Sequence, residues 1–222
     1  MYKSIVRLTI IVLLIFPTLN INAQFWRFGI RAGASSTAWT GDHISFENIQ
    51  YNSKIGGFIG FYFAKDNRKN WDFEYGLNIS LKGFDLTGQL FVPGVQLGAN
   101  LKNHGVYIDV PVAIKYYFVR GAPSGFFVKA GFSLSFLVYN TIEGQVIYNG
   151  NSSFYGEPES NASELHRLDF ILFPGIGYQL KNGLNFQLLW ERGLINMVID
   201  NDYLGWTKAY NQSFKLVIGY DL

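Results

Sequence analysis

The stretch Trp71-Asp-Phe-Glu-Tyr-Gly-Leu-Asn-Ile-Ser-Leu81 alternates without a break between apolar side chains and polar or small ones. Side chains two residues apart lie on the same face of a β-strand, so this period of two predicts a strand with one apolar face. Its length matches the roughly 9–11 residues that a tilted membrane-spanning strand needs.

Seven more segments of the chain show the same pattern. With the first one, the predicted strands cover residues 25–35, 54–63, 71–84, 105–118, 125–139, 165–180, 184–192 and 213–222. The connections alternate in length: short turns cover 65–70, 120–124 and 181–183, and long polar loops cover 37–52, 85–104, 140–164 and 193–212. Tight turns at one end and long loops at the other are typical of transmembrane β-barrels.

Composition narrows the class of protein. Apolar residues make up 49% of the 222 residues and charged residues only 15%, against about 25% in an ordinary soluble domain. A disordered chain would be more charged and less apolar. The formal charge of +2 argues against nucleic acid as a partner, and the absence of cysteine excludes disulfides and thiolate chemistry.

The polar face of the predicted strands separates a membrane barrel from a soluble one. It collects charges of both signs, while the opposite face is almost entirely apolar. That polarity suits a barrel with lipid outside and polar groups inside. The sequence therefore predicts an all-β fold, an eight-stranded antiparallel up-and-down barrel of the outer membrane. The charged side chains expected to form a structural network in the lumen are Arg27, Arg31, Asp72, Glu74, Lys82, Asp109, Lys115, Lys129, Arg167, Asp169, Glu191 and Lys215.

Aromatic residues gather at the short-turn ends of the predicted strands. We expect them to form an interfacial belt, where rings have an apolar body in lipid and a polar edge among headgroups. The belt residues are Trp26, Tyr62, Trp71, Tyr116, Phe118, Phe126, Tyr178 and Tyr220. Side chains fill the interior of an eight-stranded barrel, so we expect negligible conductance. A narrow polar conduit or proton path is the alternative.

The N-terminus has the three parts of a secretory signal. Lys3 and Arg7 precede an apolar run over 10–16, Pro17 ends it, and Ala23 offers a cleavage site. We expect residues 1–23 to be a cleaved signal peptide and 24–222 to be the barrel domain, located in the outer membrane of a Gram-negative bacterium. An uncleaved N-terminal anchor helix is the alternative.

Catalytic and metal-binding patterns are weak. The histidines His43, His104 and His166 are scattered, and only His166 lies near a serine and an acid, Ser163 and Glu164. Such a group at the outer rim could serve a lipid A-modifying enzyme. Another set of candidate oxygen ligands for Ca²⁺ comprises Asp200, Asn201 and Asp202. A solvated loop explains both groups more simply, so the sequence predicts no enzyme, no cofactor and no metal.

The stretch Tyr107-Ile-Asp-Val-Pro-Val-Ala-Ile-Lys-Tyr-Tyr117 carries the most specific family resemblance. With the shorter stretches at 28–33, 127–131, 175–178 and 219–220, it resembles the PorT-like outer-membrane β-barrel family. The resemblance implies a barrel without known catalytic residues, and one branch of that family is implicated in type IX secretion. Pro111 would face the lumen, where it predicts an irregularity in the strand pairing.

The predicted function is non-enzymatic: an envelope structural role or surface interaction through four outer loops. An accessory part of a type IX-like secretion system is the alternative, and a lipid A-modifying barrel is the third. The expected partners are outer-membrane lipid and lipopolysaccharide, the barrel assembly machinery during biogenesis and, for the alternative, secretion-system proteins. The final strand, ending at Leu222, resembles the signal that this machinery reads. The barrel is expected to be a monomer.

Overall fold

A computed structural model describes residues 26–42, 49–66, 70–92, 95–119, 124–148, 151–157, 165–199 and 208–222. Within these ranges, no helix is long and apolar enough to cross a membrane. The predicted signal peptide lies outside the described residues, so it stays a prediction.

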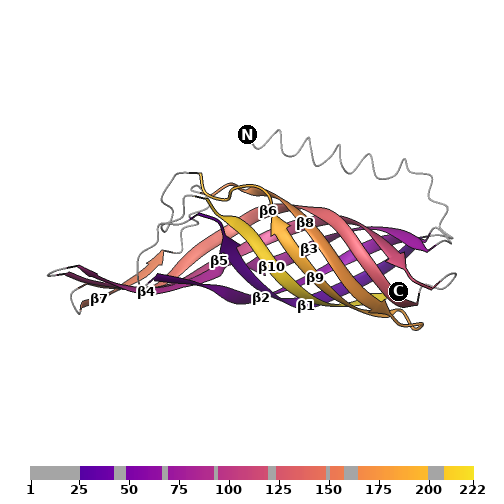
Figure 1. Ribbon diagram of the computed structural model, residues 1–222, viewed down its shortest axis with the longest axis horizontal. Helices are drawn as coiled ribbons and strands as arrows, with labels where there is room; N and C mark the ends of the chain where they lie inside the picture. Colours follow the sequence, from indigo (N-terminus) through magenta and orange to yellow (C-terminus); the bar gives the residue numbers. More distant parts are fainter. Residues whose placement is uncertain are drawn as a thin grey trace.

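Ten strands make up the described structure (Figure 1). They are β1 (Trp26–Thr40), β2 (Ile49–Asp66), β3 (Trp71–Lys82), β4 (Phe84–Val92), β5 (Val95–Tyr117), β6 (Gly125–Tyr148), β7 (Asn151–Glu157), β8 (Leu168–Gln179), β9 (Leu184–Gly193) and β10 (Tyr210–Asp221).

Eight of these strands close into an antiparallel ring in the order β1, β2, β3, β5, β6, β8, β9, β10. The ring closes because β1 pairs with β10, from Gly29↔Asp221 to Thr40↔Tyr210. Closure leaves no exposed edge in the ring and satisfies its backbone groups. The predicted eight-stranded antiparallel barrel is confirmed.

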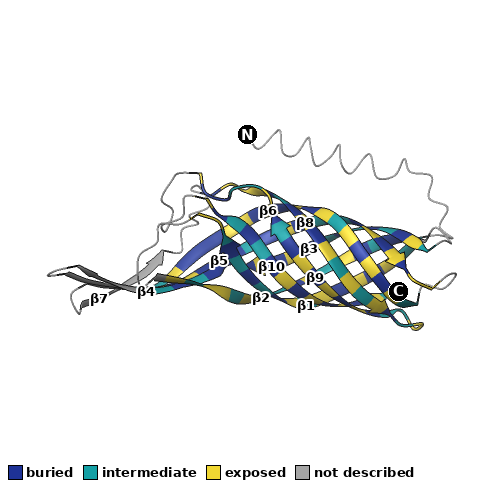
Figure 2. Ribbon diagram, in the orientation of Figure 1, coloured by how far each residue is buried: buried dark blue, intermediate teal, exposed yellow. Residues whose placement is uncertain are grey.

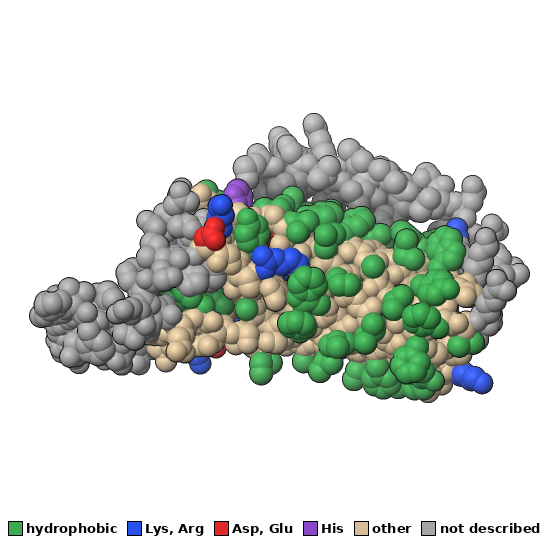
Figure 3. All heavy atoms as spheres, in the orientation of Figure 1, with side chains coloured by type: hydrophobic (Ala, Val, Ile, Leu, Met, Phe, Trp, Pro, Cys, Tyr) green, Lys and Arg blue, Asp and Glu red, His purple; other side chains and the backbone are tan. Residues whose placement is uncertain are grey.

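The period of two in the sequence is the inside–outside alternation of the barrel wall (Figure 2). In β3, Asp72, Glu74 and Asn78 are buried, whereas Ile79 and Leu81 are exposed. Figure 3 shows hydrophobic side chains over the visible wall of the barrel. This arrangement is the reverse of a soluble barrel, which has a polar outside and an apolar core.

The two ends of the barrel differ. At the turn end, defined by the connections 67–70, 118–124 and 180–183, the strands join through short segments. The last of these is a tight turn in which Gly183 has φ 91° and the Asn182 side chain accepts a hydrogen bond from the Leu184 amide at 3.2 Å. Asn-Gly dipeptides favour such turns because glycine adopts positive φ without strain. The opposite end is called the sheet end here.

The prediction of long loops is wrong for two of the four segments, over most of their length. Residues 85–104 and 140–164 contain β4, the first part of β5, the last part of β6, and β7. The strands β5 and β6 stay paired beyond the ring, from Gly105↔Asn140 to Leu97↔Tyr148. At about 3.4 Å per residue, that run is roughly 27 Å long. The prediction missed these strands because their apolar positions, such as Leu86, Leu101 and Ile142, are separated by many glycine and polar residues that resemble a loop.

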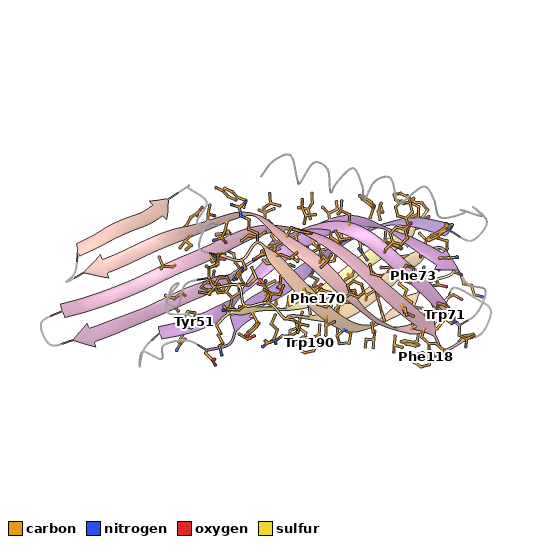
Figure 4. The ribbon with its side chains drawn as sticks, turned by 90° about the horizontal axis from the view of Figure 1, so that it is seen from above. Tyr51, Trp71, Phe73, Phe118, Phe170 and Trp190 are labelled. Atoms are coloured by element: carbon orange, nitrogen blue, oxygen red, sulfur yellow. The ribbon has the colours of Figure 1, made fainter. Side chains whose placement is uncertain are left out.

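The strands beyond the ring form one surface, which we call the projecting sheet. It consists of residues 49–53 of β2, β4, residues 97–105 of β5, residues 140–148 of β6, and β7. Figure 4 shows the long strands extending past the barrel on one side. The strand β7 lies at one edge of the projecting sheet, because it pairs with β6 and with no other described strand.

Candidate functional site

The lumen holds most of the charges predicted for it. Ten are buried, namely Arg31, Asp72, Glu74, Lys82, Asp109, Lys115, Lys129, Asp169, Glu191 and Lys215. Arg27 is half-buried. Arg167 is exposed, so its predicted place in the lumen is wrong. It precedes the first residue of β8, where the regular alternation that fixes side-chain direction has not yet begun.

Glu74 is the centre of the first charge layer. Its Oε1 accepts hydrogen bonds from Arg31 Nη1 at 2.7 Å and Lys129 Nζ at 2.6 Å. Its Oε2 lies 2.7 Å from Lys115 Nζ. Three cations therefore surround one carboxylate, and Arg31 also donates to the Asn78 side chain at 2.8 Å. Buried charges are tolerated when paired and hydrogen-bonded in this way.

Asp109 is the centre of a second charge layer, nearer the sheet end. Lys82 Nζ donates to its Oδ1 at 2.8 Å, and the Ser80 and Ser135 hydroxyls donate to the two carboxylate oxygens at 2.6 and 2.5 Å. Lys215 lies 3.7 Å from Asp109 and 2.8 Å from Glu191. This layer ties β3, β5, β6, β9 and β10 together across the barrel axis.

A third layer closes the turn end. Arg27 pairs with Asp72 and, at 2.8 Å, with Asp221. Tyr62 donates its hydroxyl to Asp221 and accepts from Asn185 Nδ2 at 3.1 Å. The prediction that Tyr62 belongs to the outer belt is therefore wrong. It lies at an inward position of β2, and Phe63 takes the outward position beside it, stacked on Tyr75 with ring centroids 5.5 Å apart.

An apolar cluster closes the sheet end. The segment after β9 crosses this end of the barrel: Val198 bridges to Leu165, and the Met197 amide donates to the Ala209 carbonyl at 2.7 Å. Beneath it, Asn211 donates to Asp169 at 2.8 Å. The buried cluster consists of Trp39, Phe84, Leu86, Leu101, Tyr107, Leu137, Ile142, Leu165, Met197, Val198 and Ala209.

The filled lumen decides what the interior can do. Between the Glu74 and Asp109 layers, a cavity lined by Arg31, Asp109 and Ser133 has a volume of about 20 Å³. Such a space holds about one water molecule. The interior therefore works as a paired polar core that locks the strands together. Pro111 faces this core, and the β3–β5 ladder is interrupted beside it, as the sequence predicts.

The other predicted belt residues lie on the outward face at the turn end. Phe126 and Tyr178 meet edge to face with centroids 4.8 Å apart, and Tyr116 meets Phe118 at 5.7 Å. Figure 4 shows Trp71 and Phe118 at this end of the barrel. Trp26 is half-buried, and the exposed members are Trp71, Tyr116, Phe118, Phe126, Tyr178 and Tyr220.

The weak catalytic and metal candidates do not form a described site. His104 and His166 are exposed, whereas His43, Ser163, Glu164 and the triplet 200–202 lie outside the described residues. Within the described residues, no group of three or more His, Asp or Glu side chains could hold a metal ion.

Sequence reasoning missed two features that the tertiary structure creates. One is the apolar closure of the sheet end, where Met197 and Trp39 come together from distant parts of the chain. The other is Arg192, which lies on the outward face of β9 among apolar neighbours. The continuation of the alternating pattern from Trp190 to Arg192 was the available signal, because it places both side chains outside.

The closed ring, its apolar outside and its charged, filled lumen define an eight-stranded outer-membrane β-barrel. The chain belongs to the outer membrane protein beta-barrel domain family, which matches residues 20–198. This family places the protein in the outer membrane. The narrower resemblance to PorT-like barrels stays a prediction.

Three bacterial proteins are among the solved structures to which this chain is similar. Ail, the attachment invasion locus protein of Yersinia pestis, solved with the heparin analogue sucrose octasulfate, is 10% identical, with a TM-score of 0.47 over 89% of this chain and 99% of that one. Neisserial surface protein A is 11% identical, with a TM-score of 0.44 over 88% of this chain and 97% of that one. OprG from Pseudomonas aeruginosa is 16% identical, with a TM-score of 0.42 over 88% of this chain and 95% of that one. No curated protein matches the sequence. At these identities, the similarity concerns the fold alone.

Proposed function

We propose that this protein is a non-enzymatic surface-interaction barrel that binds an extended segment of another polypeptide at the free edge of β7. The observation that carries the proposal is the projecting sheet, which continues past the ring from Gly105↔Asn140 to Leu97↔Tyr148. A barrel needs no such extension to close or to anchor itself. Two of the four predicted outer loops, 85–104 and 140–164, contribute strands to this sheet, and binding takes place through the sheet more than through separate loops.

The edge of β7 supplies the binding chemistry. The strand pairs with β6 from Ile142↔Glu157 to Tyr148↔Asn151, and within the described residues no strand lies on its other side. Alternate backbone N–H and C=O groups of an edge strand point away from the sheet and can pair with an added strand. The sequence Asn151-Ser-Ser-Phe-Tyr-Gly-Glu157 has no proline and one charge, so it has few of the features that block strand addition.

The experiment compares two single proline substitutions in β7, Ser152→Pro and Ser153→Pro. Each removes one backbone N–H donor, and the two donors point in opposite directions. Along β7, neighbouring residues alternate between pairing with β6 and pointing to the free edge. Of Ser152→Pro and Ser153→Pro, one therefore removes an outward donor and the other a donor to β6. A photo-crosslinking residue at Tyr155 would report polypeptides bound on intact cells.

The expected result is that crosslinked polypeptides disappear in the variant lacking the outward donor. The outward-donor variant should keep the β6–β7 hairpin, and protection of its β6 amides in hydrogen exchange checks this. Crosslinks that persist in both variants, or that are absent from the wild type, would contradict strand addition. The lipid A-modifying alternative stays a prediction, because Ser163 and Glu164 lie outside the described residues.

A further inference from the structure

The outward wall of the barrel contains an apolar depression, here called the outer-wall groove. Its volume is about 620 Å³. Ala130 of β6 and Pro174 of β8 are register partners, and both are smaller than the residues around them. The larger side chains that border the groove include Ile176, Leu188, Trp190 and Phe214. A chain of methylene groups fits such a surface better than a flat wall would.

The strand pairing explains why the groove occurs here. The β8–β9 register runs from Ile171↔Gly193 to Leu172↔Arg192 and resumes at Gly175↔Leu189. Proline has no N–H to donate, so Pro174 interrupts the ladder at this point. Figure 4 shows Trp190 on the outside of the barrel. The groove is therefore part of the fold and does not depend on the orientation of one flexible side chain.

Arg192 lies directly beyond this groove, two residues after Trp190 on the same face of β9. Its Nη1 donates to the Thr40 hydroxyl and, at 3.1 Å, to Gln212 Oε1. The guanidinium carbon lies 5.4 Å from the centre of the Tyr210 ring. Within the described part of the chain, no carboxylate lies within ion-pair distance of Arg192, and its Nη2 and Nε donate to no described acceptor.

The surroundings make an unpaired cation costly at this position. Leu172 is the register partner of Arg192 on one side, and Trp190 and Phe214 form the adjacent outward row. An arginine at the edge of an apolar band is stabilised by an anion or by headgroup water. A guanidinium has five N–H donors in a planar fork, which suits phosphate oxygens.

We propose that the outer-wall groove and Arg192 together bind one lipid of the sheet-end leaflet whose headgroup carries an anionic phosphate monoester, without the compensating cation of a choline headgroup. An acyl chain lies over Ala130 and Pro174, and the lipid phosphate accepts hydrogen bonds from the free donors of Arg192. The Thr40 and Gln212 oxygens hold the guanidinium at the wall in the required position. The site does not involve the β7 edge, so a negative result for one of the two proposals leaves the other unaffected.

Lys65 provides a matched control. It is also exposed on the outward side of the barrel, but at the turn end, where its ammonium lies 5.7 Å from the Trp26 ring. Lys65 does not line the outer-wall groove. Substituting Lys65 therefore removes one outward positive charge without touching the proposed site.

The test is native mass spectrometry of the full barrel in detergent with one of three probes: diphosphoryl lipid A, phosphatidylcholine or inorganic phosphate. We expect one lipid A molecule to stay bound under collision energies that remove phosphatidylcholine. Arg192→Gln should weaken lipid A binding about tenfold, as loss of one charge-assisted hydrogen bond does. Lys65→Gln should match the wild type, and Ala130→Leu should weaken binding by filling the groove.

Three results would overturn the proposal. Equal retention of lipid A and phosphatidylcholine would mean that the groove takes any lipid. Unchanged lipid A binding in Arg192→Gln would show that the Arg192 guanidinium does not contribute to the site. Displacement of lipid A by millimolar inorganic phosphate, together with unchanged binding in Ala130→Leu, would leave only a phosphate site. Heat-dependent gel migration of each variant checks that the barrel is folded.

Discussion

Tyr62 of β2 and Asp221 of β10 are joined by a hydrogen bond inside the lumen at the turn end, over β1, which lies between the two strands. A glycine makes this possible, because Gly29 is the register partner of Tyr62 on β1. A Cβ at Gly29 would lie 2.3 Å from the tyrosine ring. The bond joins strands that are distant in the sequence and lies beside the ring-closing pair Gly29↔Asp221.

Tyr62→Phe should lower the free energy of unfolding by about 1–2 kcal/mol. The change removes the hydroxyl donor and leaves the half-buried Asp221 carboxylate with one partner fewer. Urea unfolding in lipid vesicles, followed by tryptophan fluorescence, measures the difference. Phe63→Leu is the control for losing aromatic character on the outward face. An unfolding midpoint equal to that of the wild type would show that the bond contributes nothing.

Gly76→Ala should destabilise the barrel much more than Gly57→Ala. At Gly76, a Cβ would lie 2.4 Å from the Phe61 carbonyl oxygen and 2.6 Å from Arg31 Nη2, so the Arg31–Glu74 pair would have to move. At Gly57, the nearest atom would be 3.4 Å away. Overpacking of this kind costs about 1–3 kcal/mol. Refolding yields and unfolding midpoints of the two variants, measured side by side, give the comparison; similar values would contradict it.

Glu74→Gln should be among the most destabilising single substitutions in the lumen. It leaves Arg31, Lys115 and Lys129 buried around a neutral amide, and breaking a buried ion pair typically costs about 3–5 kcal/mol. Adding Lys129→Met should restore part of the loss by removing one unpaired cation. A double variant no more stable than Glu74→Gln would show that the three cations are not coupled through this carboxylate.

The purified barrel should show negligible single-channel conductance in planar bilayers. The Glu74 and Asp109 layers fill the lumen, and the apolar cluster with Met197 closes the sheet end. Steps of porin size from the wild type would contradict this. Deleting the segment that carries Met197 should not open a channel either, because the charge layers beneath it stay paired.

The pKa of His104, at the base of the projecting sheet, should lie below its ordinary value. Partial desolvation of the imidazole lowers the pKa, and the nearby Lys54 ammonium lowers it further, while Glu143 raises it. The folded protein then binds fewer protons than the unfolded chain between the two pKa values, so stability falls as the pH drops through that window. In NMR titrations, Lys54→Met should raise the His104 pKa and Glu143→Gln should lower it. Shifts in the opposite directions would contradict the assignment.

The barrel wall was predictable because a single physical rule determines the order of apolar and polar residues along each strand. Between Trp71 and Leu81, each outward residue meets an apolar environment and each inward residue meets polar side chains, so strand period and burial coincide. The rule fails at Tyr62, whose amphipathic side chain suits either face. It also fails for residues 85–104 and 140–164, where apolar residues such as Leu86 and Leu101 stand among many glycine and polar residues that resemble a loop.

By itself, the sequence determined the closed eight-stranded ring, its inside-out polarity and most of the lumen charges, because these depend on local alternation. The tertiary structure alone decided which cations surround Glu74, that Gly29 makes room for Tyr62, and that β5 and β6 carry a sheet beyond the ring. It also placed Arg192 above the outer-wall groove. These features depend on register between strands far apart in the chain, and a single sequence does not specify that register.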